Sequence, residues 1–190
     1  MTALLLVAAA LTPAQRRAEF GGDHNLDPGG RNAARAISVT ADTWVSGPSR
    51  AAQQTAAALG GTPDITPALA DVDYGDWTGH TLDQVDVRPW LTDPHFTPPG
   101  GESLTAVRDR AGAWLDTVAG QNLAAVAHTT VVRAVLAHAL DLPADGIWRL
   151  DVAPLAVLPL THRAGRWHLR LGPAEPLRRT PTRGRGAPSP

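Results

Sequence analysis

Two residues in this sequence combine a side chain that can do chemistry with a position that suits catalysis. His128 ends the apolar run "LAAVAH" and directly precedes the helical pattern "TTVVRAVLAHAL". Asp71 stands in an acidic run with Asp73 and Asp76. Because an imidazole changes protonation near neutral pH and a carboxyl group can carry a proton, His128 and Asp71 could act as general acid and base. A capped structural histidine and a solvated acidic loop are the alternative interpretations.

The composition restricts the other chemistry that the chain can perform. Its 190 residues include no Cys, which excludes disulfides, thiolate catalysis and zinc–thiolate sites. The seven His show no metal-ligand spacing such as H-E-x-x-H, so no metal site is predicted. The net charge is −1, and no apolar run reaches the roughly 18 residues of a membrane span. We therefore predict neither nucleic acid nor a membrane as a partner.

The elements that would position these residues alternate between strand and helix, which predicts an α/β domain. Strands are expected at 3–9, 43–46 and 123–128, the last being a continuous apolar run typical of a central parallel strand. Helices are expected to begin at "DPGG" (27–30), to run from Pro48 to the glycines at 60–61, and to cover 103–120 and 129–140. A β-hairpin is predicted over 155–171, with its turn at Arg163–Gly165.

Four segments resemble the histidine phosphatase superfamily in their order and spacing. They are "LLLV" with its following loop, "GPSRAAQQTAAAL", "DVDYGDWTGHTL" with "PPGGESL", and "VAHTTVVRAVLAHAL", so that the resemblance covers about residues 3–172. The resemblance implies a phosphoglycerate mutase-like three-layer α/β/α sandwich, whose mostly parallel sheet gains an antiparallel edge from the closing hairpin. It also implies a small, anionic ligand, and phosphohistidine chemistry without a cofactor. The oligomeric state stays open.

The family's catalytic residues can be assigned to this sequence position by position. The nucleophilic His falls on Ala9, the first phosphate-binding Arg on Ala8 and the second on Ala51. Asp71 takes the place of the catalytic acid, commonly a Glu, and His128 matches the second His. The remaining expected contacts to the ligand come from Thr12, Gln15, Arg50 (one position before the expected Arg), His80 and Thr129. Without a nucleophile the covalent route is lost, so this chain is expected not to form a phosphohistidine.

Three hypotheses explain the substituted positions. The chain is an inactivated variant of a working phosphatase, in which a single change at Ala9 removed the nucleophile. Alternatively, it is a natural pseudophosphatase that binds a ligand or a partner. In the third hypothesis the cleft serves another class of reaction, with His128 and Asp71 as acid and base.

The ends of the chain carry their own predictions. "LLLVAAALTPAQRR" could be the apolar core of a secretion signal, but "MTA" supplies no positive charge before it. Cleavage after Ala10 or Ala14 would also remove the first strand, so a cytoplasmic location is predicted. One domain is expected over 1–172. Residues 173–190 are rich in Pro, Gly and Arg, which predicts a disordered tail.

Overall fold

A computed structural model describes residues 3–171 of the chain, which form a mixed sheet between two layers of helices. The strands are β1 (Ala3–Ala8), β2 (Trp44–Ser46), β3 (Asp64–Ile65), β4 (Leu123–Ala127), β5 (Val157–Arg163) and β6 (Arg166–Leu169). The helices are α1 (Pro13–Arg16), α2 (Pro28–Arg35), α3 (Arg50–Ala58), α4 (Arg88–Thr92), α5 (Leu104–Thr117) and α6 (Thr129–Ala139). Short 3-10 helices are η1 (Pro67–Leu69), η2 (Gly75–Trp77) and η3 (Ala144–Arg149).

The strand order is β3-β2-β4-β1-β5-β6. The pairs β1–β4, β2–β4 and β2–β3 are parallel, whereas β5 pairs antiparallel with β1 and β6. The turn between β5 and β6 holds Ala164 and Gly165, both at positive φ, as a two-residue hairpin turn requires. This confirms the predicted fold class, including the antiparallel edge contributed by the closing hairpin.

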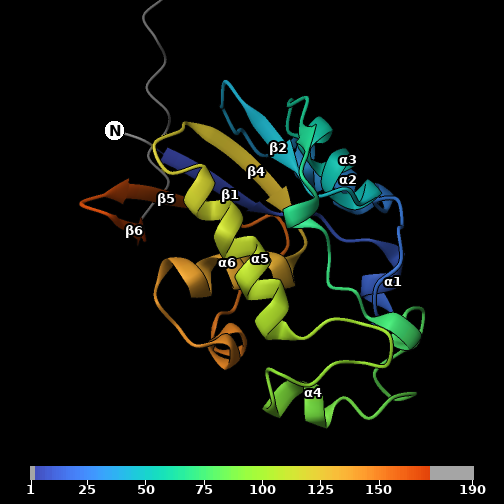
Figure 1. Ribbon diagram of the computed structural model, residues 1–190. Coiled ribbons are helices and arrows are strands. Elements are labelled where there is room, and N and C mark those ends of the chain that lie inside the picture. Colours follow the sequence, from blue (N-terminus) through green and yellow to red (C-terminus); the bar gives the residue numbers. More distant parts are fainter. Residues whose placement is uncertain (1–2, 172–190) are drawn as a thin grey trace, which may run out of the picture.

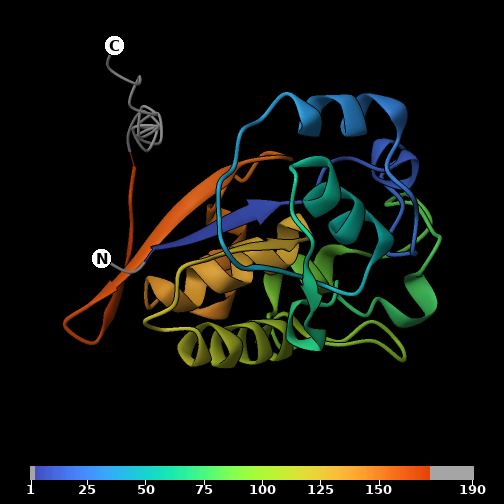
Figure 2. The same cartoon turned by 90° about the horizontal axis from the view of Figure 1, so that it is seen from above.

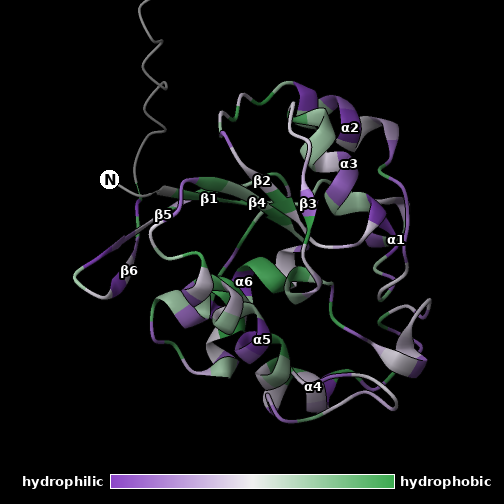
Figure 3. Ribbon diagram, turned by 45° about the horizontal axis from the view of Figure 1, so that its top comes forward, coloured by the Kyte–Doolittle hydropathy of each residue, from purple (hydrophilic) through white to green (hydrophobic). Residues whose placement is uncertain are grey.

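Helices cover both faces of the sheet (Figures 1 and 2). α2 and α3 lie on one face, and α5 and α6 lie side by side on the other. Side chains of β1 and β4 alternate between these layers, because successive residues of a strand point to opposite faces. Leu4, Leu6 and Ala8 pack in the cluster that contains α5 and α6, whereas Val7 and Ala9 pack in the cluster that contains α3. The apolar colouring of β1 and β4 in Figure 3 reflects this burial on both faces.

Side-chain caps fix where the helices begin. Asp27, Ser49 and Ser103 each accept a hydrogen bond from the backbone N–H three residues later, at the starts of α2, α3 and α5. The helix predicted over 103–120 begins as expected and ends at Thr117. The elements α1, α4, β3 and the 3-10 helices were not predicted from the sequence. These elements are too short to show a hydrophobic period.

A segment between β3 and α5 covers the carboxyl end of the sheet. It contains η1, η2 and α4, and its aromatic side chains pack on Phe20 from the loop after α1. Within residues 3–171, no helix is long and apolar enough to cross a membrane. The tail predicted for 173–190 lies outside the described residues.

Candidate active site

A cleft opens beyond the carboxyl ends of the parallel strands, where open α/β sheets bind their ligands. Its inner part encloses about 70 Å³ and is lined by Thr12, Gln15, Glu19, Gly21, Gly22, Asp71, Tyr74, His128, Thr129 and Thr130. An adjoining hollow of about 400 Å³ is lined by Gly21, Gly22, Asp23, Pro48, Ser49, Asp71, Val72, Asp73, Tyr74 and Thr78. Together they offer room for a small molecule.

His128 lies at the centre of this cleft, between the end of β4 and the start of α6. Its side chain is 7% exposed. Its Nε2 lies 2.9 Å from Oγ of Ser49, and its Nδ1 lies 3.7 Å from Oδ2 of Asp71. The amide Nε2 of Gln15 is 3.5 Å from the same Nδ1. The structure thus brings together the two residues predicted as acid and base, His128 and Asp71.

Two neighbours of Nδ1 influence which nitrogen of the His128 imidazole carries the proton. The carboxylate of Asp71, 3.7 Å from Nδ1, favours a proton on that nitrogen, whereas the amide N–H of Gln15, 3.5 Å from it, favours a lone pair there. In the tautomer with its proton on Nδ1, Nε2 accepts a hydrogen bond from the hydroxyl of Ser49. The same Oγ accepts from the N–H of Ala52, 3.2 Å away, so that Ser49 is held by both of its bonding partners.

Asp71 is held in place by its backbone and by its own carboxylate. Its Oδ1 accepts a hydrogen bond from the N–H of Val72 at 2.9 Å. Arg110 of α5 donates to the carbonyl oxygens of Asp71 (3.1 Å) and Ala68 (2.9 Å) and forms two bonds with the carboxylate of Glu102. The result is a guanidinium clamp that fixes the loop bearing the acid.

The loop after β1 builds the opposite wall. Thr12 caps α1, and Gln15 returns its side-chain oxygen to the N–H of Thr12, forming a capping box. This box explains why the amide nitrogen of Gln15 points toward His128. Thr12, Gln15 and Thr129, which the resemblance proposes as ligand contacts, line the inner part of the cleft.

Three alanines, Ala8, Ala9 and Ala51, stand where the family resemblance places the nucleophile and the two phosphate-binding Arg, and Ala10 follows Ala9. Ala8 and Ala10 are 0% exposed, Ala51 is 1% exposed and Ala9 is 2% exposed. Among the residues that the structure describes, none of these four lines the cleft. Their backbone is fixed as well, since Ala9 donates to the carbonyl of Ala127 and Ala10 donates to Oγ1 of Thr55.

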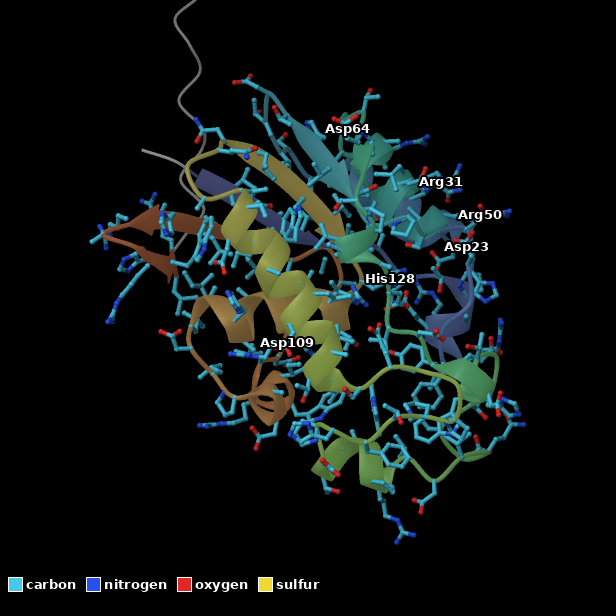
Figure 4. All side chains as sticks on the ribbon, viewed as in Figure 1. Asp23, Arg31, Arg50, Asp64, Asp109 and His128 are labelled. Carbon is cyan, nitrogen blue, oxygen red and sulfur yellow. The ribbon has the colours of Figure 1, made fainter. Side chains whose placement is uncertain are left out.

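Two predicted ligand contacts lie away from the cleft lining. Arg50 is 61% exposed and pairs with Asp23 at 3.3 Å, and Figure 4 shows these two side chains together at the periphery, apart from His128. Because each helical residue turns by about 100°, the one-residue offset from the family position directs the guanidinium away from the lining, to Asp23 at the edge of the outer hollow. His80 is exposed, and its carbonyl accepts from the N–H of Phe20, which fixes the loop without bringing the ring to the lining.

The cleft lining is acidic rather than basic. Among residues 3–171, no Arg side chain lines either hollow, whereas Asp71 and Glu19 line the inner part and Asp23 and Asp73 line the outer part. Burial raises the pKa of the Tyr74 phenol well above its usual range, and the Asp71 carboxylate adds to the effect. Tyr74 therefore stays neutral, with its hydroxyl bonded to that of Thr130.

Several lining residues were missed from the sequence. From the sequence, Ser49 is recognisable only as a helix cap, because its contact with His128 joins positions 79 residues apart. The lining also includes Glu19, Gly21 and Gly22, which follow α1 in a loop without a catalytic motif, and Tyr74, which lies three residues after Asp71. No cluster of three or more His, Asp or Glu within the described part of the chain is arranged to hold a metal ion.

Comparison with known proteins connects this cleft to a family. A bifunctional protein of Mycobacterium tuberculosis is 33% identical over 101 residues, which cover 47% of this chain and 28% of that protein. The glucosyl-3-phosphoglycerate phosphatase of Mycolicibacterium vanbaalenii is 33% identical over 122 residues, covering 53% of this chain and 54% of that enzyme. The matched part is thus about half or less of these relatives.

Solved structures share the fold across nearly the whole domain. A mycobacterial glucosyl-3-phosphoglycerate phosphatase superposes with a TM-score of 0.78 at 24% identity, covering 88% of this chain and 96% of that one. A phosphoserine phosphatase variant from Entamoeba histolytica, in complex with phosphoserine, gives 0.80 at 19% identity, covering 89% and 95%. The model of the histidine phosphatase superfamily (branch 1) matches residues 8–172. With strand order, cleft position and the family model in agreement, the chain belongs to the histidine phosphatase superfamily.

Proposed function

We propose that this chain is a histidine-phosphatase scaffold that does not perform phosphohistidine chemistry and that keeps its cleft for a small molecule. The observation that carries the proposal is the set of buried alanines at positions 8, 9, 10 and 51. An alanine at the nucleophile position offers no lone pair to phosphorus. The covalent route is absent whatever else the cleft retains.

The charge of the lining supports the same conclusion. Phosphoryl transfer spreads negative charge over three oxygens, and each missing donor of an anion site costs about 10²–10³ in rate. Both Arg positions are Ala, and Arg50, which lines neither hollow, pairs with Asp23 at the edge of the outer one. The anionic ligand implied by the resemblance meets Asp71 and Glu19 instead of guanidinium groups. That the ligand is anionic remains a prediction.

A relative supports binding without turnover. The phosphoserine phosphatase in complex with phosphoserine carries an alanine in place of a histidine. A cleft of this fold can thus hold a small ligand after a histidine has been replaced. The same reasoning applies here to a small molecule held by His128, Gln15 and Thr129.

The test compares phosphate release from a panel of phosphomonoesters by this chain and by Ala9→His, with thermal melts to confirm that both are folded. We expect none from the chain as it stands. Turnover by Ala9→His alone favours the inactivated-variant hypothesis, and inertness of a folded Ala9→His favours the natural pseudophosphatase. Phosphate release by the unmodified chain would overturn the proposal.

A further inference from the structure

The residues around His128 form a linear arrangement that the family's phosphate chemistry does not use. Ser49 Oγ, His128 and the Asp71 carboxylate follow one another, with Oγ–Nε2 at 2.9 Å and Nδ1–Oδ2 at 3.7 Å. Hydroxyl, imidazole and carboxylate in this order are the parts of a serine nucleophile with its general base and the group that orients that base. We propose that Ser49, His128 and Asp71 hydrolyse uncharged carboxylic esters. The proposal rests on the proposed function, in that the phosphohistidine route is closed.

The position of Ser49 suits a nucleophile. It is the N-cap of α3, so the positive end of the helix stabilises negative charge that develops on its oxygen. It lines the outer hollow and is partly buried, so a substrate there meets the hydroxyl directly. Its Oγ lies 2.9 Å from Nε2 of His128, within hydrogen-bond distance of the base. The Nδ1–Oδ2 separation is longer than a hydrogen bond, as catalytic contacts often are before substrate binds.

The orientation of Asp71 is fixed by contacts independent of His128. Val72 N–H holds one carboxylate oxygen and leaves the other facing the imidazole. The clamp of Arg110 and Glu102 fixes the backbone behind it. A carboxylate held in this manner stabilises the imidazolium that forms when Ser49 loses its proton.

The start of α6 can stabilise the oxyanion. Thr129 and Thr130 line the inner cleft and occupy its first turn. The N–H groups of a first turn have no acceptor within the helix, and no side chain caps this one. Such donors suit the single negative oxygen of a tetrahedral intermediate.

The same features distinguish an ester from a phosphate as the substrate. Acyl transfer develops one negative charge, which backbone N–H groups can hold. A phosphate dianion needs cations, and among the described residues the cleft lining has no Arg while Asp71, Asp23 and Asp73 border the outer hollow. An uncharged ester with a small acyl group fits this lining.

Each bond change in the reaction is balanced. Ser49 Oγ attacks the carbonyl carbon as its proton moves to Nε2 of His128. The intermediate collapses, the carbon–oxygen bond to the alcohol breaks, and His128 returns the proton to that alcohol. Water then attacks the acyl-serine, again giving a proton to His128. The acid leaves as Ser49 recovers its proton.

The experiment uses the full chain with two probes, a fluorophosphonate that labels activated serines and p-nitrophenyl acetate. The Ser49→Asn variant keeps a good N-cap and removes the nucleophile. Ser103→Asn is its matched control, because Ser103 caps α5 with the same 3.2 Å bond that Ser49 makes in α3. His128→Gln removes the base, which contributes about 10²–10⁴ in rate.

We expect peptide mass spectrometry to find the label on Ser49 in the unmodified chain and in Ser103→Asn, and not in His128→Gln. Ester hydrolysis should fall at least about 100-fold in folded Ser49→Asn. An unlabelled Ser49, or hydrolysis that Ser49→Asn leaves unchanged, would overturn the proposal. Phosphate release measured on the same samples tests the proposed function separately. If the unmodified chain releases phosphate and Ser49→Asn does not, the assignment to carboxylic esters would be overturned.

Discussion

The guanidinium clamp behind Asp71 leads to a quantitative prediction about stability. The Arg110 side chain is 25% exposed and makes four hydrogen bonds, two of them to Glu102. Arg110→Met removes all four while keeping much of the aliphatic stem. It leaves the Glu102 carboxylate, which is 20% exposed, without its charged partner.

The size of the effect follows from this partial burial. Breaking a fully buried ion pair by removing one partner costs about 3–5 kcal/mol. Here water can reach part of the pair and can rehydrate the freed carbonyls, so we expect a loss of about 2–3 kcal/mol in the free energy of unfolding. With a urea m-value of about 2 kcal/mol/M, the unfolding midpoint should fall by about 1–1.5 M.

Arg108 provides the matched control on the same helix. Its side chain is also 25% exposed, but it bonds a single carbonyl, that of Leu142, besides a 3.5 Å contact with Asp109. Arg108→Met should cost about 1 kcal/mol or less. Hydrogen exchange should then show faster exchange of the 68–73 segment in Arg110→Met only. Equal midpoints for the two variants, or unchanged exchange in that segment, would refute the clamp.

Two further predictions concern the loops and pH. Gly75→Ala should lower the free energy of unfolding by about 3 kcal/mol or more, because φ is +51° and the new Cβ would lie 2.1 Å from a backbone oxygen. Gly79→Ala, at φ +82° with nothing within 4 Å, should lower it by about 1 kcal/mol through backbone strain alone. Urea titration of both variants tests this order, and a larger loss in Gly79→Ala would contradict it. The Arg16 guanidinium and then the Gly30 N–H hold the pKa of Asp27 below its ordinary 3.8. A lowered folded-state pKa adds stability above the unfolded value and loses it as pH falls through the folded value. The difference in unfolding midpoint between the chain and Asp27→Asn should therefore shrink below about pH 4, and a constant difference down to pH 2 would contradict this.

The local order of strands and helices could be predicted from the sequence because each long element repeats a simple period. β4 is apolar throughout, and α5 and α6 carry apolar stripes bounded by a cap or a turn. The helices α1 and α4 and the strand β3 were not predicted, since they have five residues or fewer and depend on tertiary contacts.

The sequence by itself determined the fold family and the order of its long strands and helices along the chain. The order of strands and helices along the chain is enough for this, because parallel strands bring their carboxyl ends to one edge of the sheet. Only the tertiary structure decided that Arg50 turns to Asp23, that the lining is acidic, and that Ser49 lies within hydrogen-bond distance of His128. These depend on side-chain directions and on contacts between positions far apart in the chain, which no local pattern encodes.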